Sequence, residues 1–179
     1  MRWRGRPRYD VRVTAVLEIL SLRERPEAIE QLARWHFAQW GPYNPANDVE
    51  RRIAGLQRHL ASQGVPQTFI AVDGETLLGS ASLVAADLAS RENLSPWLAA
   101  VYVDSPHRNR GVGAALVNRV VEEARSLGLP TLYLFTTDRS AFYAKLGWQV
   151  VEETDWNGTA VTVMELPLVV AGASSPPQT

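Results

Sequence analysis

Apolar and polar residues follow two periods along this chain, and the change of period marks its secondary structure. Short runs rich in β-branched and aromatic residues predict strands, whereas apolar residues three or four positions apart predict helices with one buried face. The predicted strands span residues 13–22, 68–72, 77–85, 97–103, 131–135, 148–155 and 159–166. The predicted helices span residues 26–37, 50–60, 112–127 and 138–146. Helices between the middle strands and hairpins at the ends predict an α/β (α+β) fold, with a mixed, mostly antiparallel sheet of about six or seven strands and about four helices.

Turn-forming residues separate these elements. Pro26 suits the first turn of a helix, and Gly41 ends the apolar periodicity that follows it. Asp138 is placed to cap the short helix before Gly147. Asn157-Gly158 readily takes the positive φ angles of a tight turn, so the last two strands are expected to form a hairpin.

The chain of 179 residues suits one domain with one core. We expect this domain to span residues 13–168, between a flexible basic N-terminus of residues 1–12 and a flexible, small and polar tail of residues 169–179. The N-terminal arginines are not followed by the apolar run of a secretory signal, and no apolar stretch approaches the roughly 20 residues of a membrane span. The expectation is a cytoplasmic protein without a membrane partner.

Charge and cysteine content exclude several kinds of chemistry. A formal net charge of -1 provides no overall basic surface for nucleic acid. The absence of cysteine removes disulfides, thiolate metal sites and a cysteine nucleophile. His36 and His59 have no further ligand at metal spacing, so no metal is expected.

The most specific chemical signal is a glycine-bearing turn between a strand and a helix. The apolar run of residues 97–103 leads through a polar segment into Arg108-Asn109-Arg110-Gly111-Val112-Gly113. The first turn of a helix presents unpaired N–H groups and the positive end of its dipole, and glycine lets phosphate oxygens approach closely. Leu116 breaks the dinucleotide fingerprint, and no Gly-Lys pair completes a P-loop. A pyrophosphate-sized site without a kinase lysine is therefore expected.

Two blocks of this sequence resemble the GNAT (N-acetyltransferase) superfamily, in the manner of a bacterial single-domain member. Arg108, Gly111 and Gly113 match the fixed positions of its cofactor motif, [Q/R]-x-x-G-x-[G/A]. Residues 141–148, AFYAKLGW, are similar to its downstream segment F-Y-x-K-L-G-[F/W]. The order of elements agrees over nearly the whole body. Ser105 departs from the family's usual proline, and Thr136 replaces a common asparagine that contacts pantetheine.

The resemblance implies the GNAT acyl-CoA N-acyltransferase fold, with two central strands that splay apart and acetyl-CoA as co-substrate. Tyr143 matches the family's general acid, which protonates the leaving thiolate. Pantetheine would pair along the strand backbone, and pyrophosphate would meet the N–H groups of the glycine turn. The implied cofactor-binding residues are Val101, Tyr102, Val103, Arg108, Asn109, Arg110, Gly111, Val112, Gly113, Ala114, Thr136 and Phe142.

The acceptor side is less specific. Candidates for the general base are Glu92, Asp87, Asp104 and His107, and a chain of waters is an alternative. Glu92 is the preferred catalytic carboxylate because it lies in the polar loop before the central strand. Aromatic residues with carboxylates favour a cationic amine. The expected acceptor-binding residues are Trp40, Tyr43, Asp87 and Trp97.

These features lead to one functional hypothesis with two alternatives. The leading hypothesis is an enzyme that transfers acetyl from acetyl-CoA to a primary amine of a small, cationic molecule by direct attack in a ternary complex. The alternatives are a protein or peptide N-acetyltransferase, and a coenzyme A-binding module without catalysis. Relatives often dimerise, so a homodimer stays open.

Overall fold

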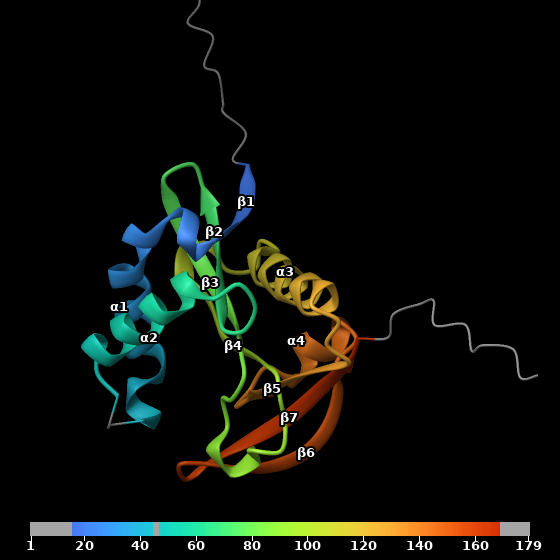
Figure 1. Cartoon of the computed structure of the whole chain (residues 1–179). Coiled ribbons are helices and arrows are strands. Elements are labelled where there is room, and N and C mark those ends of the chain that lie inside the picture. Colours follow the sequence, from blue (N-terminus) through green and yellow to red (C-terminus); the bar gives the residue numbers. More distant parts are fainter. Residues whose placement is uncertain (1–15, 45–46, 169–179) are drawn as a thin grey trace, which may run out of the picture.

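The computed structural model describes residues 16–44 and 47–168, and Figure 1 shows how the elements are arranged. The strands are β1 Leu17–Ser21, β2 Gln67–Asp73, β3 Thr76–Val84, β4 Trp97–Val103, β5 Thr131–Thr136, β6 Gln149–Trp156 and β7 Thr159–Pro167. The α-helices are α1 Ile29–Trp40, α2 Val49–Ala61, α3 Val112–Ser126 and α4 Ser140–Lys145. The seven-stranded sheet has the order β1-β2-β3-β4-β5-β7-β6, in which only the β4–β5 pair is parallel. The predicted mixed α/β fold is confirmed.

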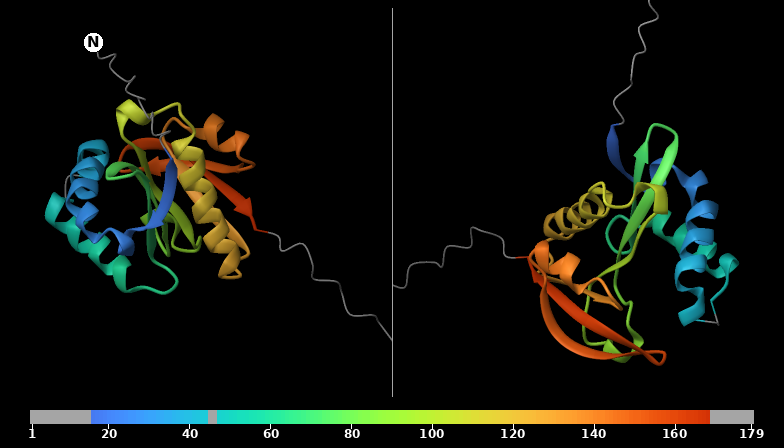
Figure 2. Two further views of the ribbon diagram at one scale, coloured as in Figure 1. Left: turned by 90° about the horizontal axis from the view of Figure 1, so that it is seen from above. Right: turned by 180° about the vertical axis from the view of Figure 1, so that it is seen from behind.

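Helices cover the sheet on both faces, as the two views in Figure 2 show. Helices α1 and α2 pack on one face, where Leu32 and Leu56 meet Ile70 of β2. Helix α3 packs on the other, where Leu116 joins a cluster with Phe69, the neighbour of Ile70. Because successive strand residues point to opposite faces, a strand buried on both sides must be apolar throughout. This explains the unbroken apolar run at the centre of β2.

The two halves of the sheet separate between β4 and β5. These strands are joined at a single register position, Trp97 opposite Tyr133, where the Tyr133 N–H donates to the Pro96 carbonyl at 3.0 Å. Two residues of β4, Ala100 and Val101, lie opposite Ala81 alone, and Ala100 has a φ of 50°. Such a bulge bends a strand and increases its twist. Beyond the bulge, the edge of β4 that faces β5 therefore has no partner strand among the described residues (Figure 1).

Two local predictions need correction. The first strand begins at Leu17 and ends at Ser21, because Leu22 turns into a short 3-10 helix with its side chain in the core. Asp138 does not cap α4: the N-cap is Arg139, whose N–H donates instead to the Thr136 hydroxyl at 3.0 Å. The other predicted elements are found within a few residues of their expected bounds, and Asn157 and Gly158 both have positive φ at the β6–β7 turn. Residues 1–12 and 169–179 lie outside the described part.

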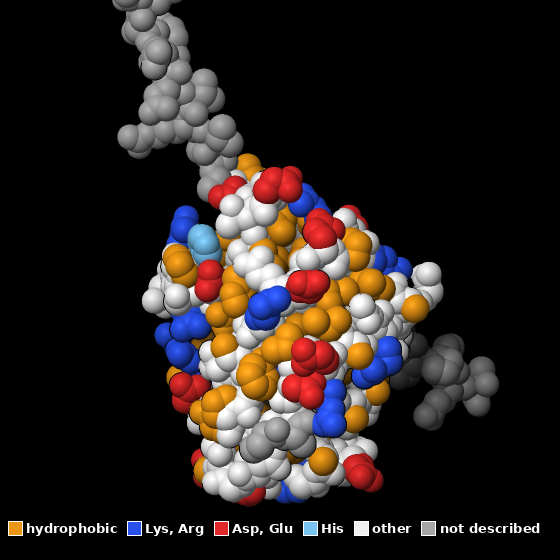
Figure 3. Space-filling view, turned by 90° about the vertical axis from the view of Figure 1, so that its left-hand side faces the viewer, with side chains coloured by type: hydrophobic (Ala, Val, Ile, Leu, Met, Phe, Trp, Pro, Cys, Tyr) orange, Lys and Arg blue, Asp and Glu red, His pale blue; other side chains and the backbone are white. Residues whose placement is uncertain are grey.

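The face formed by α1 and α2 carries both signs of charge (Figure 3). Arg34 pairs with Glu30 at 3.7 Å and Arg51 with Asp48 at 3.8 Å, each within one helical turn. Interspersed charges of this kind create no extended field of one sign. Within the described residues, no helix has the length and apolar character needed to cross a membrane.

Candidate active site

A cavity of about 640 Å³ opens where β4 and β5 separate. One end is lined by the start of α3 and by α4, and the middle by residues 98–103 of β4. The other end is lined by α1, α2, the turn η3 Gly41–Tyr43 between them, and the tip of the β6–β7 hairpin. The cavity therefore joins the glycine turn to the opposite face of the sheet.

The glycine turn at the start of α3 has the geometry expected of an anion site. Asn109 and Gly111 have φ angles of 59° and 81°, and Gly111 is the helix N-cap without any side-chain capping bond. The first helical bond runs from the Ala115 N–H to the Gly111 carbonyl at 3.0 Å. The N–H groups of Val112 to Ala114 thus have no helical acceptor and remain available for an anion.

The residues beside this turn differ in what they contact. Arg108 donates from Nε to the Val103 carbonyl at 2.9 Å, and its guanidinium carbon is 5.8 Å from the centre of the Tyr102 ring. Arg108 therefore ties the turn to β4. At Gly113 a Cβ would make ordinary van der Waals contact with Phe142 and Val103, at 3.6 and 3.7 Å, so these two side chains pack close to the helix start. Arg110 lines a smaller neighbouring cavity instead.

Tyr143 lies on α4 at the wall of the main cavity. Its side chain is buried, with ring contacts to Phe142 at 5.0 Å and Trp148 at 6.1 Å between centroids. No hydrogen bond from its hydroxyl to another described residue is found, and the oxygen is not sealed from solvent. Desolvation raises the pKa of Tyr143 to about 12, outweighing the opposite effect of Arg139. The phenol thus stays protonated and faces the cavity.

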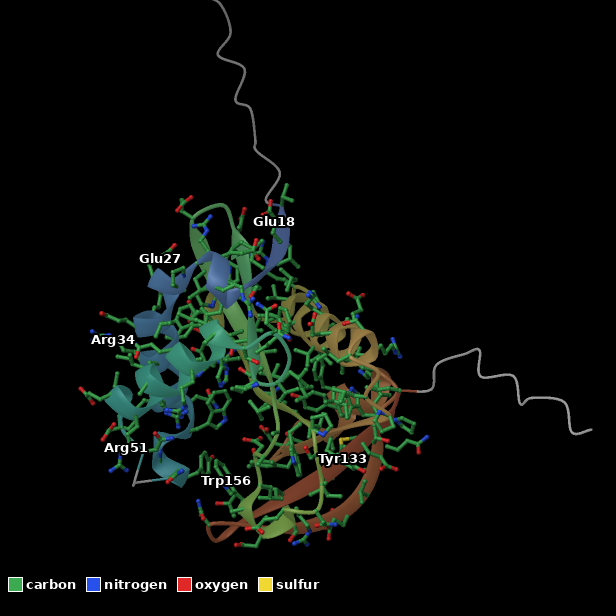
Figure 4. The ribbon with its side chains drawn as sticks, viewed as in Figure 1. Glu18, Glu27, Arg34, Arg51, Tyr133 and Trp156 are labelled. Carbon is green, nitrogen blue, oxygen red and sulfur yellow. The ribbon has the colours of Figure 1, made fainter. Side chains whose placement is uncertain are left out.

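The far end of the cavity is enclosed from two sides. The Tyr43 ring stacks on Trp156 with centroids 5.5 Å apart, and the Asn157 side chain donates to the Tyr43 carbonyl at 3.0 Å. Figure 4 shows Trp156 at the tip of the β6–β7 hairpin, toward the side of α1 and α2. Trp40 also lines this end. Segments more than 100 residues apart thus meet here.

Asp87 lies in the loop between β3 and β4, and it is the carboxylate that lines this far end of the cavity. Desolvation raises the pKa of its carboxyl to about 7, although the residue as a whole is exposed. The two observations pull in opposite directions, since water that reaches the exposed side chain weakens its desolvation; the upward direction of the pKa shift holds because many protein atoms lie around the carboxyl. The loop is anchored by Arg91, whose guanidinium makes paired bonds of 2.5 and 2.8 Å to the Glu152 carboxylate.

The structure does not bring every predicted acceptor residue to the cavity. Trp97 is fully buried in the core beside Tyr133 and Phe135, and its indole N–H donates to the Leu94 carbonyl at 2.7 Å. It therefore has no surface to offer an acceptor. Glu92 is exposed at the end of the 3-10 turn η4 Ala89–Arg91 and does not line the cavity. Among the proposed base candidates, Asp87 and His107 do line it.

Sequence reasoning missed several cavity residues, of which Trp156 and Arg52 are the most informative. Trp156 lies next to a hairpin turn, and nothing in the sequence places that turn beside Tyr43. Arg52 does carry a signal, because it is spaced four residues before buried Leu56 and so lies on the apolar side of α2. A charged residue on the apolar side of a helix is therefore a candidate for a functional role.

Possible metal ligands do not gather in this cavity. Across residues 16–44 and 47–168, no group of three or more His, Asp or Glu side chains is arranged to hold a metal ion. The polar groups of the cavity can bind an anion at α3, donate a proton from Tyr143 and accept one at Asp87.

The parallel strands β4 and β5 separate beside the N-terminus of α3, which has no side-chain cap. Together with the mixed seven-stranded sheet, this arrangement defines the acyl-CoA N-acyltransferase fold. Comparison with known proteins agrees. The family model "Acetyltransferase (GNAT) family" matches residues 28–148, about two thirds of the chain. The chain therefore belongs to the GNAT acetyltransferase family, whose co-substrate is acetyl-CoA.

Solved structures show the same fold at low sequence identity. yncA from Salmonella typhimurium, solved with its cofactor acetyl-CoA, is 19% identical with a TM-score of 0.66, over 89% of this chain and 98% of that one. An aminoglycoside 6'-N-acetyltransferase complexed with coenzyme A is 19% identical with a TM-score of 0.65, over 88% and 99%. A GNAT acetyltransferase from Staphylococcus aureus Mu50 is 16% identical with a TM-score of 0.65, over 86% and 100%. No curated protein sequence matches this chain significantly.

Proposed function

We propose that this chain transfers the acetyl group of acetyl-CoA to a primary amine of a small molecule, by direct attack within a ternary complex. The observation that carries this proposal is one continuous cavity, which runs from the free N–H groups of α3 past Tyr143 to an enclosed end with Asp87. Its enclosure by Tyr43 and Trp156 favours a small acceptor over a folded protein. The aminoglycoside acetyltransferase among the similar structures also acts on a small amine-bearing molecule.

The cofactor fits the first half of this cavity. The N–H groups of residues 112–114 would bind pyrophosphate, and Arg108 would keep the turn in place. The free edge of β4 at residues 100–103 would hydrogen-bond pantetheine, since no strand pairs with it there. Phe142 and Thr136 line the same passage. With the cofactor bound in this way, its thioester would lie near Tyr143.

At the reacting centre, the amine nitrogen attacks the thioester carbonyl carbon, so a C–N bond forms and the C–S bond breaks. Asp87 is proposed to take the proton that the amine loses, in preference to the exposed Glu92, because its carboxyl lines the cavity and its raised pKa of about 7 suits a base near neutral pH.

Tyr143 is proposed to give the departing thiolate its proton. An ordinary thiol has a pKa of about 8.5, well below the value of about 12 for Tyr143. The same desolvation raises the pKa of a thiol in this cavity and narrows that difference. The phenol therefore donates a hydrogen bond as charge develops on sulfur and transfers its proton late.

A panel of primary amines with thiol-release detection tests this function. We expect turnover of at least one small amine, with formation of the N-acetyl product verified by mass spectrometry. Transfer to peptides with no turnover of small amines would favour the peptide acetyltransferase. Coenzyme A binding without transfer to either class would favour the non-catalytic module.

A further inference from the structure

Among the described arginines, Arg52 is the partly buried one that lacks a counter-charge. It projects from α2 at the far end of the cavity, which the proposed function assigns to the acceptor and which is called the acceptor end below. Its Nε is buried without a hydrogen-bond partner. Among the described residues no side-chain hydrogen bond or ion pair to Arg52 is found. By contrast, the partly buried arginines Arg25, Arg91 and Arg119 each pair with a glutamate at 3.0 Å or less.

An unpaired guanidinium in such a place is unfavourable. Desolvation lowers the pKa of Arg52, which means that the charged form has lost hydration that no protein group replaces. A guanidinium offers a planar fork of N–H donors that matches the two oxygens of a carboxylate or a phosphate. A ligand anion would therefore satisfy the buried Nε and the charge together.

No described acid supplies this anion from within the protein. Burial accounts for the raised pKa of Asp87, without any opposing effect of a cation, so Asp87 and Arg52 are not an ion pair. The group that does sense Arg52 is His36, whose pKa falls to about 3, first through desolvation and then through the charge of Arg52. His36 lies in the core, hydrogen-bonded to the Ser80 hydroxyl at 2.9 Å, and stays neutral. The positive charge of Arg52 is thus uncompensated.

Arg52 lies away from the site assigned to the cofactor phosphates, so an anion bound to Arg52 would not be one of those phosphates. Those phosphates are assigned to the start of α3, whereas α2 covers the opposite face of the sheet. The other residues that line this end come from α1, η3, β6 and the loop with Asp87. An anion bound to Arg52 therefore belongs to the acceptor.

We propose that the acceptor amine carries a second, anionic group, a carboxylate or a phosphate, which Arg52 binds while the amine faces Asp87. This inference rests on the proposed acetyl transfer and narrows its substrate class. The acceptor is then zwitterionic, with its ammonium drawn to the carboxylate end and its anion to Arg52, rather than a simple cation. An anchored anion also fixes the amine in one orientation for attack, which raises the rate through positioning.

The test compares matched acceptors on matched variants. The acceptors are ω-amino acids of increasing length, the corresponding ω-amino amides, and ω-aminoalkyl phosphates. The variants are Arg52→Met and Arg58→Met, which remove the same charge from the same helix, but Arg58 is exposed and outside the cavity. We expect the wild type to prefer one anionic series over the amides. Arg52→Met should raise KM for that series by about 10- to 100-fold, the usual effect of one charged hydrogen bond, and Arg58→Met should not.

A binding measurement separates this inference from the proposed function. Quenching of Trp fluorescence, with coenzyme A present, reports anionic acceptor binding beside Trp40 and Trp156 without any turnover. Binding by the wild type but not by Arg52→Met supports the inference even if no acetyl transfer occurs. Equal use of acids and amides by an active wild type overturns it. An equal rise in KM for the acids and for the amides in Arg52→Met overturns it as well.

Coenzyme A affinity and circular dichroism show whether Arg52→Met folds. If it does not, Arg52→Lys replaces it, because the ammonium keeps the charge and loses the fork. KM for the anionic series should then rise several-fold, with the amides unchanged. A wild type without preference for either anionic series contradicts the inference whatever the variants do.

Discussion

At the scale of single residues, the cavity contains a proton donor and a proton acceptor in different surroundings. Tyr143 is packed among aromatic rings, which keeps its phenol protonated, whereas Asp87 lies in an exposed loop with its carboxyl in the cavity. Environments that push two pKa values apart in this way are typical of acid and base pairs.

Tyr143→Phe removes the proposed acid and keeps the packing of the ring. Turnover should fall by about 100-fold or more, the usual contribution of a general acid, while the affinity for coenzyme A changes little. Thiol release measures the first quantity and calorimetric titration the second. Unchanged turnover would rule out the acid role. Because the pKa of Tyr143 is raised, ionisation of the phenol should not reduce the wild-type rate below pH 10.

Asp87→Asn removes the proposed base. Since the pKa of the Asp87 carboxyl is raised to about 7, it is ionised above that pH and protonated below it. The wild-type kcat should therefore rise as pH increases from 6 to 8, and the rise should be absent in the variant, whose kcat is at least about 10-fold lower. An acceptor whose amine titrates above pH 9 keeps the two ionisations apart. Loss of the rise in Glu92→Gln, with Asp87→Asn unaffected, would instead identify Glu92 as the base.

At the scale of elements, the periodicity of apolar residues was enough to predict the helices and strands. The exceptions arise where a tertiary contact competes with a local preference. Asp138 has the usual side chain for a cap, yet the Thr136 hydroxyl at the end of β5 reaches the Arg139 N–H first. Leu22 continues the apolar run of β1 but is drawn into the core below α1. Neither contact is visible in the local sequence.

The start of α3 allows a prediction about the anion site. Gly111 and Gly128 flank this helix with φ angles of 81° and 70°, and a Cβ at either would meet nothing within 4 Å. A valine at either position is therefore strained by its backbone alone, at a cost of about 1–3 kcal/mol in stability. Gly111→Val should also weaken coenzyme A binding by 10-fold or more, because relief of the strain moves the N–H groups of the turn. Gly128→Val should leave the affinity unchanged.

Thermal unfolding and calorimetric titration measure the two effects separately. If both variants lost the same affinity, the loss would come from general destabilisation of α3. The role assigned to the Gly111 turn would then be wrong. A loss restricted to Gly111→Val ties coenzyme A to that turn.

At the scale of the whole molecule, the proposed domain of residues 13–168 can be tested by truncation. We expect the fragment to unfold within a few degrees of the full chain and to keep its kcat/KM, because the removed ends are expected to lie outside the core. A fragment ending at residue 166 should lose about 2 kcal/mol or more of unfolding free energy. It lacks Leu168, which is buried and whose N–H donates to the Pro130 carbonyl at 2.8 Å. A large drop in Tm for residues 13–168 would show that the ends contribute to the fold.

The sequence by itself determined the alternation of helices and strands and the glycine turn before α3. It also determined that this turn occurs together with the second motif, residues 141–148, which contains Tyr143. These are local properties, since strand and helix periods, turn residues and motif spacing depend on neighbours along the chain. The tertiary structure decided which carboxylate and which aromatic residues line the cavity. It buried Trp97, left Glu92 outside the cavity, and brought Trp156 and Arg52 to its wall. The physical reason is that the acceptor end is built from segments more than 100 residues apart, and their contacts depend on the bulged, separating strands of the sheet rather than on any local pattern.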